Sequence, residues 1–407
     1  MSFRLWQCGI GIAVLACTTG TAYAVGFDRD DFIVSSGFNA GFAVYDRDFT
    51  YKGELGDLPF SGGFGMDFDH DGRLVVRGIL SDTRVRQITV VEPDGSLATN
   101  QPEFVTSPPG GLDLKVAPNG NYLIAGQDAS FGEPNGLLEI EPDGTVVRQF
   151  GGGDYEGVAV LPDGTVLGGG GSFAGFLRAF DPATGDEVYS LEEFTGPRAQ
   201  TGPFFDEGQR GANSMTYSHT TNTVLMADRL SGRIYERNVD GSFVRAFDLP
   251  EDANFVPIFS LMGVTRGPGG DVFAVIDRQI VRWSAYGDWI ETIDAPDLGT
   301  VYSWNIVWAG NAPGLTFLEG DYDGDGLVSQ GDLNLVLLHW GDGVVPDGWV
   351  APDVFDGSMS QNELNAVLLN WGNDVAAGPP TVPEPAAAPA AALGLVAALT
   401  WRRQRSH

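Results

Sequence analysis

The sequence predicts an all-β fold, a six-bladed β-propeller closed by strands from both ends of the chain and followed by a small α-helical module. Three observations favour this architecture. Turn sequences recur between short β-prone runs over residues 27–295, a spare strand-like run follows at 302–310, and a loop and helix are repeated within 319–374. The predicted domains are therefore a propeller over 25–312 and a module over 319–374.

The recurring turns contain the residues that tight hairpins need. Asp-Gly and Asn-Gly pairs adopt the positive φ angles of such turns at little steric cost. Taken in pairs, the turns define a unit of roughly 45 to 55 residues with four short strands, which is the period of a propeller blade. The predicted turn positions are Gly72, Gly95, Gly120, Gly144, Gly164, Gly185, Asn222, Gly241, Gly270 and Gly287.

Five complete blades and one incomplete blade follow from these turns. The blade around Gly164 is the clearest, because GVAVLPDGTVLGGGG and GFLRAFDPATGDEVYSL each give two strands. At the N-terminal end, DRDDFIVSS and FAVYDRDFTYKGEL supply strands two to four of a blade without its first strand. The run YSWNIVWAG at 302–310 can supply that strand, so we expect a sixth blade that both chain ends close.

The propeller region resembles the NHL and gluconolactonase-like propellers, whose blades carry a similar PDG turn between hydrophobic strands. In the lactonase-like members, Glu, Asn and Asp side chains near the starts of inner strands hold a metal in the channel. Glu156 and Asn213 fall at such positions here, but Met262-Gly263 stands where the resemblance requires an acid. Because the ligand set is incomplete, we expect a non-catalytic binding or scaffold propeller, with a metal-dependent, lactonase-like hydrolase as the alternative.

An acidic run near the C-terminal end has the spacing of a calcium loop. Acids stand at positions 1, 3, 5 and 12, a glycine takes the sharp turn at 6, and positions 7 and 9 would contribute a backbone carbonyl and a water contact. Carboxylates so close together repel one another unless a hard cation lies among them, and Ca²⁺ accepts six to eight oxygens with flexible geometry. The predicted calcium ligands are Asp321, Asp323, Asp325, Leu327, Ser329 and Asp332.

A second acidic run, DFDHDG at 67–72, matches only the first half of that motif. No acid follows at position 12, which is Gly78, and Gly72 coincides with a predicted blade turn. The alternating acids of this run therefore indicate the polar face of a hairpin rather than a metal site.

The calcium loop continues into a short helix, and both are duplicated. SQGDLNLVLLHWGD returns 31 residues later as SQNELNAVLLNWGN. Apolar residues at i, i+3, i+4 and i+7 give each copy the stripe of an amphipathic helix, and helices this short are not stable alone. We therefore expect the two stripes to pack against each other. They consist of Leu333, Val336, Leu337 and Trp340 in the first copy, and Leu364, Val367, Leu368 and Trp371 in the second.

The duplicated unit over 319–374 resembles a type I dockerin, the small calcium module that docks onto cohesin domains in secreted bacterial assemblies. The resemblance implies a cohesin-like or other surface-protein partner. The second copy departs from the motif, because Pro352 and Val354 replace the first two Asp ligands while Asp356 and Glu363 remain. We expect one calcium site and a second, weak or empty one. The module is then either a docking domain or a calcium-stapled spacer.

Residues 1–24 predict an export signal. Arg4 precedes the apolar run GIGIAVLA and the small-residue cleavage site AYA. An alternative is lipid modification of Cys17. The two cysteines of the chain, Cys8 and Cys17, both lie in this segment, so the exported chain would have no disulfide.

The C-terminal end combines three features in order. Residues 375–385 form a Pro-rich linker, 386–401 an apolar run that is short for a bilayer span, and Arg402, Arg403 and Arg405 a basic end. With Val-Pro-Glu-Pro at its start, the segment 382–405 resembles the PEP-CTERM sorting signal of Gram-negative bacteria. The resemblance implies transient anchoring in the inner membrane, cleavage by an exosortase, and a mature protein at the cell surface or in the matrix.

The acidity of the chain limits its partners. Without the signal and residues 386–407, 19 Lys and Arg residues remain against 54 Asp and Glu residues. Such a surface repels nucleic acid and favours divalent cations. Neither a nucleophile elbow nor a phosphate-binding loop is present, so the sequence nominates no catalytic residue. We expect an exported surface or matrix protein, with surface proteins and matrix polysaccharide as its partners.

Overall fold

The computed structural model describes residues 25–36, 41–55, 58, 60–80, 86–98, 104–105, 113–126, 136–153, 155–170, 176–191, 211–218, 221–229, 231–251, 261–295, 303–311, 318–324, 326–343, 345–346, 348–351 and 358–373. The predicted signal at 1–24, the linker at 375–385 and the sorting segment at 382–405 lie outside these residues. Among the helices that are described, none is both long and apolar enough to cross a membrane.

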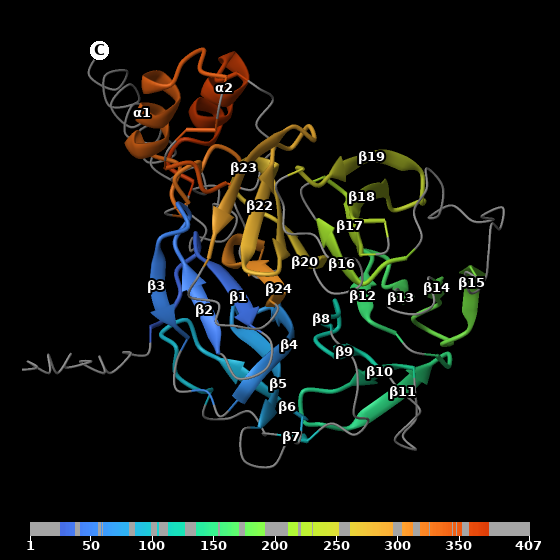
Figure 1. Cartoon of the computed structure of the whole chain (residues 1–407). Coiled ribbons are helices and arrows are strands. Elements are labelled where there is room, and N and C mark those ends of the chain that lie inside the picture. Colours follow the sequence, from blue (N-terminus) through green and yellow to red (C-terminus); the bar gives the residue numbers. More distant parts are fainter. Residues whose placement is uncertain are drawn as a thin grey trace, which may run out of the picture.

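The described strands form six four-stranded antiparallel sheets arranged as the blades of a propeller (Figure 1). From the axis outward, blade 1 consists of β24 (Ser303–Trp308), β1 (Phe32–Ser36), β2 (Phe42–Tyr45) and β3 (Tyr51–Glu54). Blade 2 consists of β4 (Phe60–Phe68), β5 (Leu74–Leu80), β6 (Arg86–Val91) and β7 (Phe104–Val105). Blade 3 consists of β8 (Leu114–Val116), β9 (Tyr122–Ala125), β10 (Leu137–Ile140) and β11 (Val146–Phe150).

The remaining three blades repeat the same order. Blade 4 consists of β12 (Gly157–Val160), β13 (Val166–Gly170), β14 (Phe176–Phe180) and β15 (Glu187–Leu191). Blade 5 consists of β16 (Ser214–Ser218), β17 (Thr223–Asp228), β18 (Arg233–Asn238) and β19 (Phe243–Asp248). Blade 6 consists of β20 (Leu261–Arg266), β21 (Val272–Ile276), β22 (Gln279–Trp283) and β23 (Trp289–Asp294). The six-bladed propeller predicted from the turn spacing is confirmed.

The blade turns have the predicted backbone conformation. Each of the ten turn positions has a positive φ, from 52° at Asn222 to 100° at Gly287. Only glycine adopts these angles freely, and asparagine tolerates them better than other residues. The local turn chemistry therefore fixed the hairpins, and hydrophobic clusters between neighbouring blades complete the fold.

Both ends of the propeller sequence meet in blade 1. Strand β24 pairs antiparallel with β1, with Trp308 opposite Phe32 and Ile306 opposite Val34. These four side chains are buried in the cluster between blades 6 and 1. The closure expected from the run at 302–310 is thus present, and it removes the unpaired edge that β1 would otherwise expose.

Three glycines on inner strands allow the blades to approach closely at the axis. A Cβ atom at Gly65 would lie 2.4 Å from the backbone nitrogen of Leu114, and one at Gly263 would lie 2.7 Å from Cα of Asn305. A Cβ atom at Gly157 would lie 2.7 Å from the carbonyl oxygen of Asn213. The backbones of neighbouring inner strands therefore lie close together, and glycine is the residue that leaves room for this approach.

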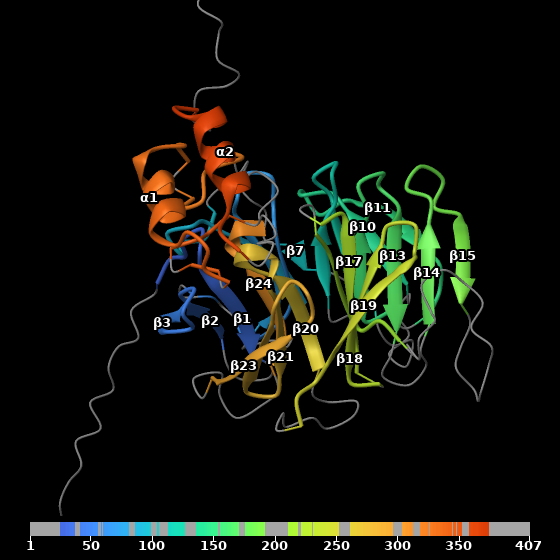
Figure 2. The ribbon, with the colours of Figure 1, turned by 90° about the horizontal axis from the view of Figure 1, so that it is seen from above.

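The described residues after the propeller include two helices, and their capping is duplicated like their sequence. Helix α1 (Gln330–Leu338) begins at a capping box of Ser329 and Asp332, and α2 (Gln361–Asn370) begins at an equivalent box of Ser360 and Glu363. The predicted loop–helix repeat is therefore a repeat of local structure. In Figures 1 and 2 both helices lie at one side of the propeller, next to blades 1 and 6.

Reciprocal backbone hydrogen bonds join the two copies. Gly341 N donates to Met359 O at 2.9 Å, and its equivalent, Gly372 N, donates to Val328 O at 2.8 Å. The returning bonds, Met359 N to Asp342 O and Val328 N to Asn373 O, measure 3.1 and 3.0 Å. Equivalent residues of the two copies thus make the same hydrogen bonds to each other's copy, as in an approximate two-fold symmetric pair.

The predicted packing of the two apolar stripes is only half correct. Val336 and Val367 are fully buried, and Leu333 and Leu364 are partly buried. The other members of the stripes, Leu337, Trp340, Leu368 and Trp371, are 47–54% exposed. Loop residues take their place, since Tyr322, Val328, Trp349, Ala351 and Met359 complete the core of the module. Trp340 and Trp371 lie beyond the last helical residues, Leu338 and Asn370, so they do not continue the buried helix face.

Candidate functional site

The acidic loop before α1 brings its described carboxylates together. Asp321, Asp323 and Asp332 each offer a ligand oxygen within 4.8 Å of the others. Asp321 and Asp332 are 0% exposed, and Asp323 is partly buried. Asp325, the remaining predicted carboxylate ligand, lies outside the described residues. Three of the four acids that the loop spacing predicts as ligands therefore lie close together.

Backbone N–H groups donate hydrogen bonds to two of these carboxylates, Asp332 and Asp321. Asp332 Oδ1 accepts hydrogen bonds from Tyr322 N at 2.6 Å and Asp323 N at 3.1 Å, and its Oδ2 accepts one from Ser329 N at 2.7 Å. Asp321 Oδ2 accepts one from Gly326 N at 3.1 Å. The Asp332 carboxylate therefore connects the beginning of the loop to the start of α1 through protein hydrogen bonds alone.

The two other predicted ligands have additional roles. Ser329 is the N-cap of α1, and its Oγ accepts a hydrogen bond from Gly331 N at 3.1 Å. Leu327 was expected to contribute only its carbonyl, which is consistent with a side chain that is 39% exposed. Neither observation tests calcium coordination, so both assignments stay predictions.

The residues of the loop fit a hard divalent cation. Buried carboxylates are unfavourable unless opposite charge or strong hydrogen bonding compensates them. The sequence contains no Lys or Arg between Arg282 and Arg402, although residues 319–374 contain 11 carboxylates. The module therefore has no fixed cation of its own, and an all-oxygen donor set of this kind suits Ca²⁺.

The equivalent region of the second copy is described only at its end. Glu363 is 9% exposed, and its Oε2 accepts hydrogen bonds from Ser360 N at 2.7 Å and Ser360 Oγ at 2.8 Å. Residues 352–357, which include Pro352, Val354 and Asp356, lie outside the described residues. The expectation of a weak or empty second site stays a prediction.

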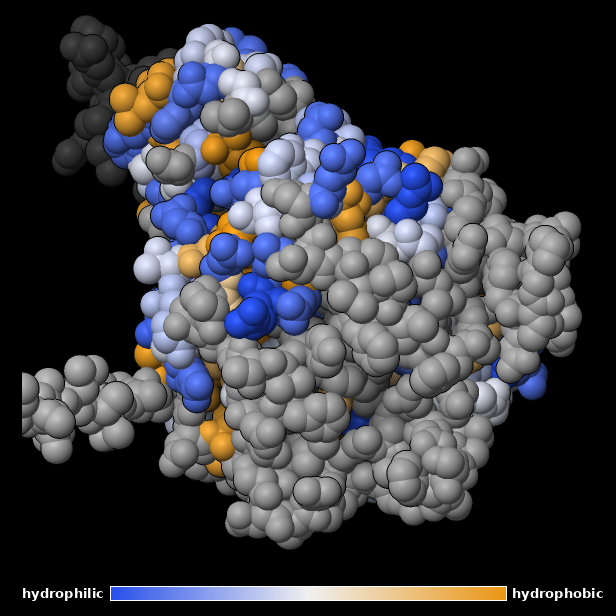
Figure 3. Space-filling model, in the orientation of Figure 1, coloured by the Kyte–Doolittle hydropathy of each residue, from blue (hydrophilic) through white to orange (hydrophobic). Residues whose placement is uncertain are grey.

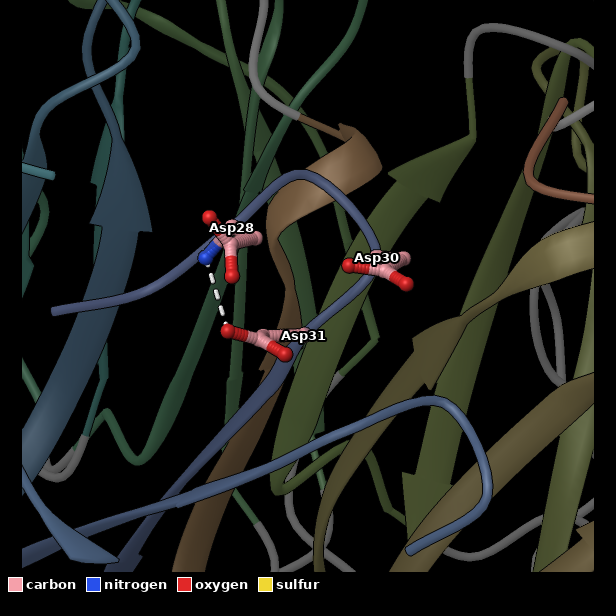
Figure 4. Close-up of side chains that lie close together, drawn as sticks. All are labelled: Asp28, Asp30 and Asp31. Carbon is pink, nitrogen blue, oxygen red and sulfur yellow. Dashed lines mark hydrogen bonds between the residues drawn. The ribbon is translucent and has the colours of Figure 1, made fainter. Parts of the chain in front are cut away.

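A second group of acids differs from the loop because a lysine lies within it. Asp28, Asp30 and Asp31 lie close together at the entry to β1 (Figure 4). Lys52 Nζ lies 2.8 Å from Asp28 Oδ2 and 2.6 Å from Asp31 Oδ2. An ammonium group thus already occupies the position between two of these carboxylates.

The acidic run at 67–72 is a blade turn, as expected. Asp69 Oδ1 accepts hydrogen bonds from Asp71 N and Arg73 N, and its Oδ2 lies 2.7 Å from the guanidinium of Arg73. Asp67 Oδ2 instead accepts a hydrogen bond from Val116 N of blade 3 at 2.8 Å. These carboxylates serve turn formation and blade packing.

Glu156 and Asn213 lie together near the axis, immediately before the inner strands β12 and β16. Asn213 Nδ2 donates to Glu156 Oε2 at 2.5 Å, and Arg229 Nη2 lies 2.7 Å from the same oxygen. All three residues are at most 5% exposed. Burial lowers the pKa of Arg229, and the charge of Glu156 opposes that shift. A guanidinium therefore contacts the carboxylate that a lactonase-like site would use for its metal.

A second buried polar cluster crosses the axis from blade 3. Asp113 Oδ1 accepts hydrogen bonds from Lys115 Nζ at 3.0 Å and from Asn305 Nδ2 at 3.2 Å. Burial raises the pKa of Asp67 to about 6, against the opposing charge of nearby Lys115. Burial also lowers the pKa of Lys115, but the charges of Asp113 and Asp67 outweigh burial and raise it overall. The axis is thus bridged by internal ion pairs and hydrogen bonds.

Sequence reasoning missed the basic partners of these acids and the exposed ends of the helices. Arg229 is 73 residues from Glu156, so no local spacing could reveal the pair. Leu338 and Leu369, each one position after a stripe residue, are 80% and 83% exposed. The exposed leucines could have been predicted from the two consecutive leucines in each copy, because a single helix face cannot bury both of them.

Comparisons with known proteins extend only to the fold. No protein-family model matches the chain, and no curated protein sequence matches it. A chain from a crystal structure of a nidogen/laminin complex is similar with a TM-score of 0.50 and 11% identity, covering 68% of this chain and 97% of that one. At this identity the likeness shows a shared fold and nothing more.

Two other solved structures are similar at lower TM-scores. A protein of unknown function from Bacteroides caccae has a TM-score of 0.49 and 14% identity, with 69% of this chain and 98% of that chain covered. A β-propeller domain from Myceliophteria thermophila has a TM-score of 0.45 and 14% identity, with 68% and 87% covered. The function must therefore be argued from the residues of this chain.

Proposed function

We propose that this is an exported surface or matrix protein in which a non-catalytic propeller binds or displays a partner and a calcium-binding, dockerin-like module supports that role. The observation that carries the proposal is the convergence of Asp321, Asp323 and Asp332 in a segment without Lys or Arg. In this proposal Ca²⁺ is bound by these acids together with Asp325, the Leu327 carbonyl and, through water, Ser329. Calcium supplies the positive charge that the module lacks.

The exposed ends of the two helices support a docking role for the module. Leu337, Leu338 and Trp340 are 48–80% exposed, and their equivalents Leu368, Leu369 and Trp371 are 47–83% exposed. Apolar surface is also visible on the module in Figure 3. Large exposed apolar side chains that recur in both copies are typical of an interaction surface. The proposed partner is a cohesin-like or other surface protein, with matrix polysaccharide as a further partner of the propeller.

The proposed location depends on the two terminal segments. Residues 1–24 would direct export, and the segment 382–405 would anchor the chain transiently in the inner membrane of a Gram-negative bacterium until an exosortase removes it. The test is to compare the intact mass of the protein recovered from the cell surface with the mass expected after both cleavages. A mature protein that retains its first 24 residues or its last 22 residues would contradict this location.

A pulldown of the exported chain tests the docking role. The bait is exposed to surface proteins and to matrix polysaccharide, with calcium or with a chelator. We expect capture of a surface protein in calcium that is lost with the chelator and with Leu338→Asp/Leu369→Asp. The matched control is Val146→Asp, because Val146 is 54% exposed on the outer strand β11 of the propeller. Equal capture by wild type and the double variant would refute docking through the helices.

The lactonase-like alternative is not favoured by the contacts at the axis. A catalytic metal would need the Glu156 carboxylate as a ligand, but Arg229 Nη2 and Asn213 Nδ2 both bind its Oε2. Assays with a panel of lactones and added divalent metals provide the test. Metal-dependent turnover that Glu156→Gln abolishes would establish the alternative over the scaffold proposal.

A further inference from the structure

The calcium loop is connected to the closure of the propeller through a short segment, 348–351. Val350 N and Ala351 N both donate to the carbonyl oxygen of Tyr322, at 2.7 and 3.3 Å. Tyr322 lies between Asp321 and Asp323, and its own N–H donates to Asp332 Oδ1 at 2.6 Å. The tyrosine that orients a proposed calcium ligand therefore also holds this segment.

Aromatic stacking strengthens that connection. The rings of Tyr322 and Trp349 are 4.1 Å apart and inclined by 21°, and both side chains are nearly fully buried. Trp349 Nε1 donates to Ala351 O at 2.9 Å. A stacked pair with a satisfied indole N–H limits the rotation of the segment relative to the loop.

The same segment inserts into the propeller where the ring closes. Val350 is 7% exposed and belongs to the hydrophobic cluster between blades 6 and 1, together with Phe32 of β1 and Trp308 of β24. Ala351 O accepts a hydrogen bond from Gly269 N at 3.1 Å. A side chain at Gly269 would meet Val345 of the module at 2.6 Å, so glycine leaves room for this contact.

Two arginines of blade 1 contact the module from the other side. Arg29 Nη1 donates to Gly324 O, inside the calcium loop, at 3.3 Å. Arg47 Nη2 donates to Pro346 O at 3.1 Å. The module is therefore fixed to both blades that meet at the closure, in contrast to a docking domain carried on a free linker.

We propose that calcium binding at residues 321–332 stabilises the closure of the propeller, with Tyr322 and the segment 348–351 transmitting the effect to β24, β1 and blade 6. This inference rests on the proposed calcium site. Any ligand that binds the folded state alone reduces local opening by a factor of 1 + [L]/Kd. Calcium that holds the acidic loop in its closed form therefore reduces opening of the closure only if the anchor at Val350 transmits that stabilisation.

Hydrogen exchange followed by mass spectrometry tests the proposal on the exported chain. Peptides from β1, β24 and β21 report the closure, and peptides from β12, β13 and β14 on the far side of the ring are the internal control. At free calcium of 100 times Kd, we expect exchange at the closure to slow by up to about 100-fold, with little change in blade 4. A calorimetric calcium titration of the same sample shows whether the ion binds.

Three variants separate the possible outcomes. Val350→Ala should retain calcium binding while closure exchange becomes nearly independent of calcium. Arg29→Gln/Arg47→Gln keeps the buried core intact and should weaken the response in the same direction. Asp321→Asn should lose both calcium binding and the response. Calcium binding without slower closure exchange in the wild type would overturn this inference alone, whereas absence of binding would overturn both this inference and the calcium proposal.

Discussion

The propeller and the C-terminal module solve the same electrostatic problem in different ways. Several buried acids of the propeller have fixed basic partners, namely Lys115 for Asp113, Arg229 for Glu156 and Arg282 for Asp271. Residues 319–374 of the module contain no Lys or Arg, and backbone N–H groups donate hydrogen bonds to Asp321 and Asp332. The propeller contains its own counter-charges, whereas we propose that the module takes one from solution as Ca²⁺.

The stability of the propeller and that of the module should therefore respond to different changes in conditions. A fixed ion pair responds to mutation of its partner and to pH, while a bound ion responds to its free concentration. Changing calcium should therefore affect the module and the closure that it contacts, and changing the internal pairs should affect the propeller. Each experiment below tests one side of this comparison.

The largest effect is expected from removing a buried basic partner. Arg229→Met leaves Glu156 buried beside Asn213 without a guanidinium, so the free energy of unfolding should fall by about 3–5 kcal/mol. Denaturant unfolding of the protein, followed by tryptophan fluorescence, measures the loss. The double variant Arg229→Met/Glu156→Gln should recover much of it. A single variant as stable as wild type would show that this pair does not balance charge at the axis.

An intermediate effect is expected from pH. The pKa of Asp67 is raised from 3.8 to about 6 in the folded state, so the native protein binds a proton more tightly than the unfolded chain does. This contribution to stability is fully present below about pH 3.8 and is lost as the pH rises through 6. A shift of about two units corresponds to roughly 3 kcal/mol.

The pH prediction is measured as a difference between two proteins. Between pH 4 and pH 7, the unfolding free energy of wild type should fall by up to about 3 kcal/mol more than that of Asp67→Asn. Asparagine can still accept the hydrogen bond from Val116 N, which makes it the matched variant. Parallel pH profiles for the two proteins would show that Asp67 is not the titrating group.

The smallest effect is expected at the acidic group that already contains a lysine. Asp28 has a side chain that is 78% exposed and pairs with Lys52. Asp28→Asn should change the unfolding free energy by less than about 0.5 kcal/mol, since exposed pairs contribute little. It should also leave the calcium titration of the chain unchanged. A loss of calcium binding in this variant would place an ion at Asp28, Asp30 and Asp31 rather than in the loop.

Much of the fold was predictable because local chemistry determines it. The Gly and Asn residues of the turns require positive φ wherever they occur, and the spare run at 302–310 had only one open strand to complete. The loop motif likewise predicted which acids of the described part converge, because alternate loop positions and position 12 face one centre.

The remaining features depend on contacts between distant residues. Asn305 reaches Asp113 across 192 residues, and Val350 joins a cluster formed mainly by blades 6 and 1. The helix period placed Leu337 and Trp340 on the same stripe as Val336, but it could not show that loop residues would fill the core instead. Periodicity identifies an apolar face, and only the tertiary structure decides how much of that face is covered.

The most direct test of the charge comparison is a calorimetric calcium titration of the protein beside its Asp321→Asn variant. Asp321 is buried in the loop, so its carboxylate should be required for binding. We expect wild type to bind one Ca²⁺ per chain with measurable heat and the variant to show none, while magnesium at the same concentration gives a weaker signal. A wild-type titration without heat, or identical titrations for the two proteins, would contradict the proposal that the module takes its counter-charge from solution.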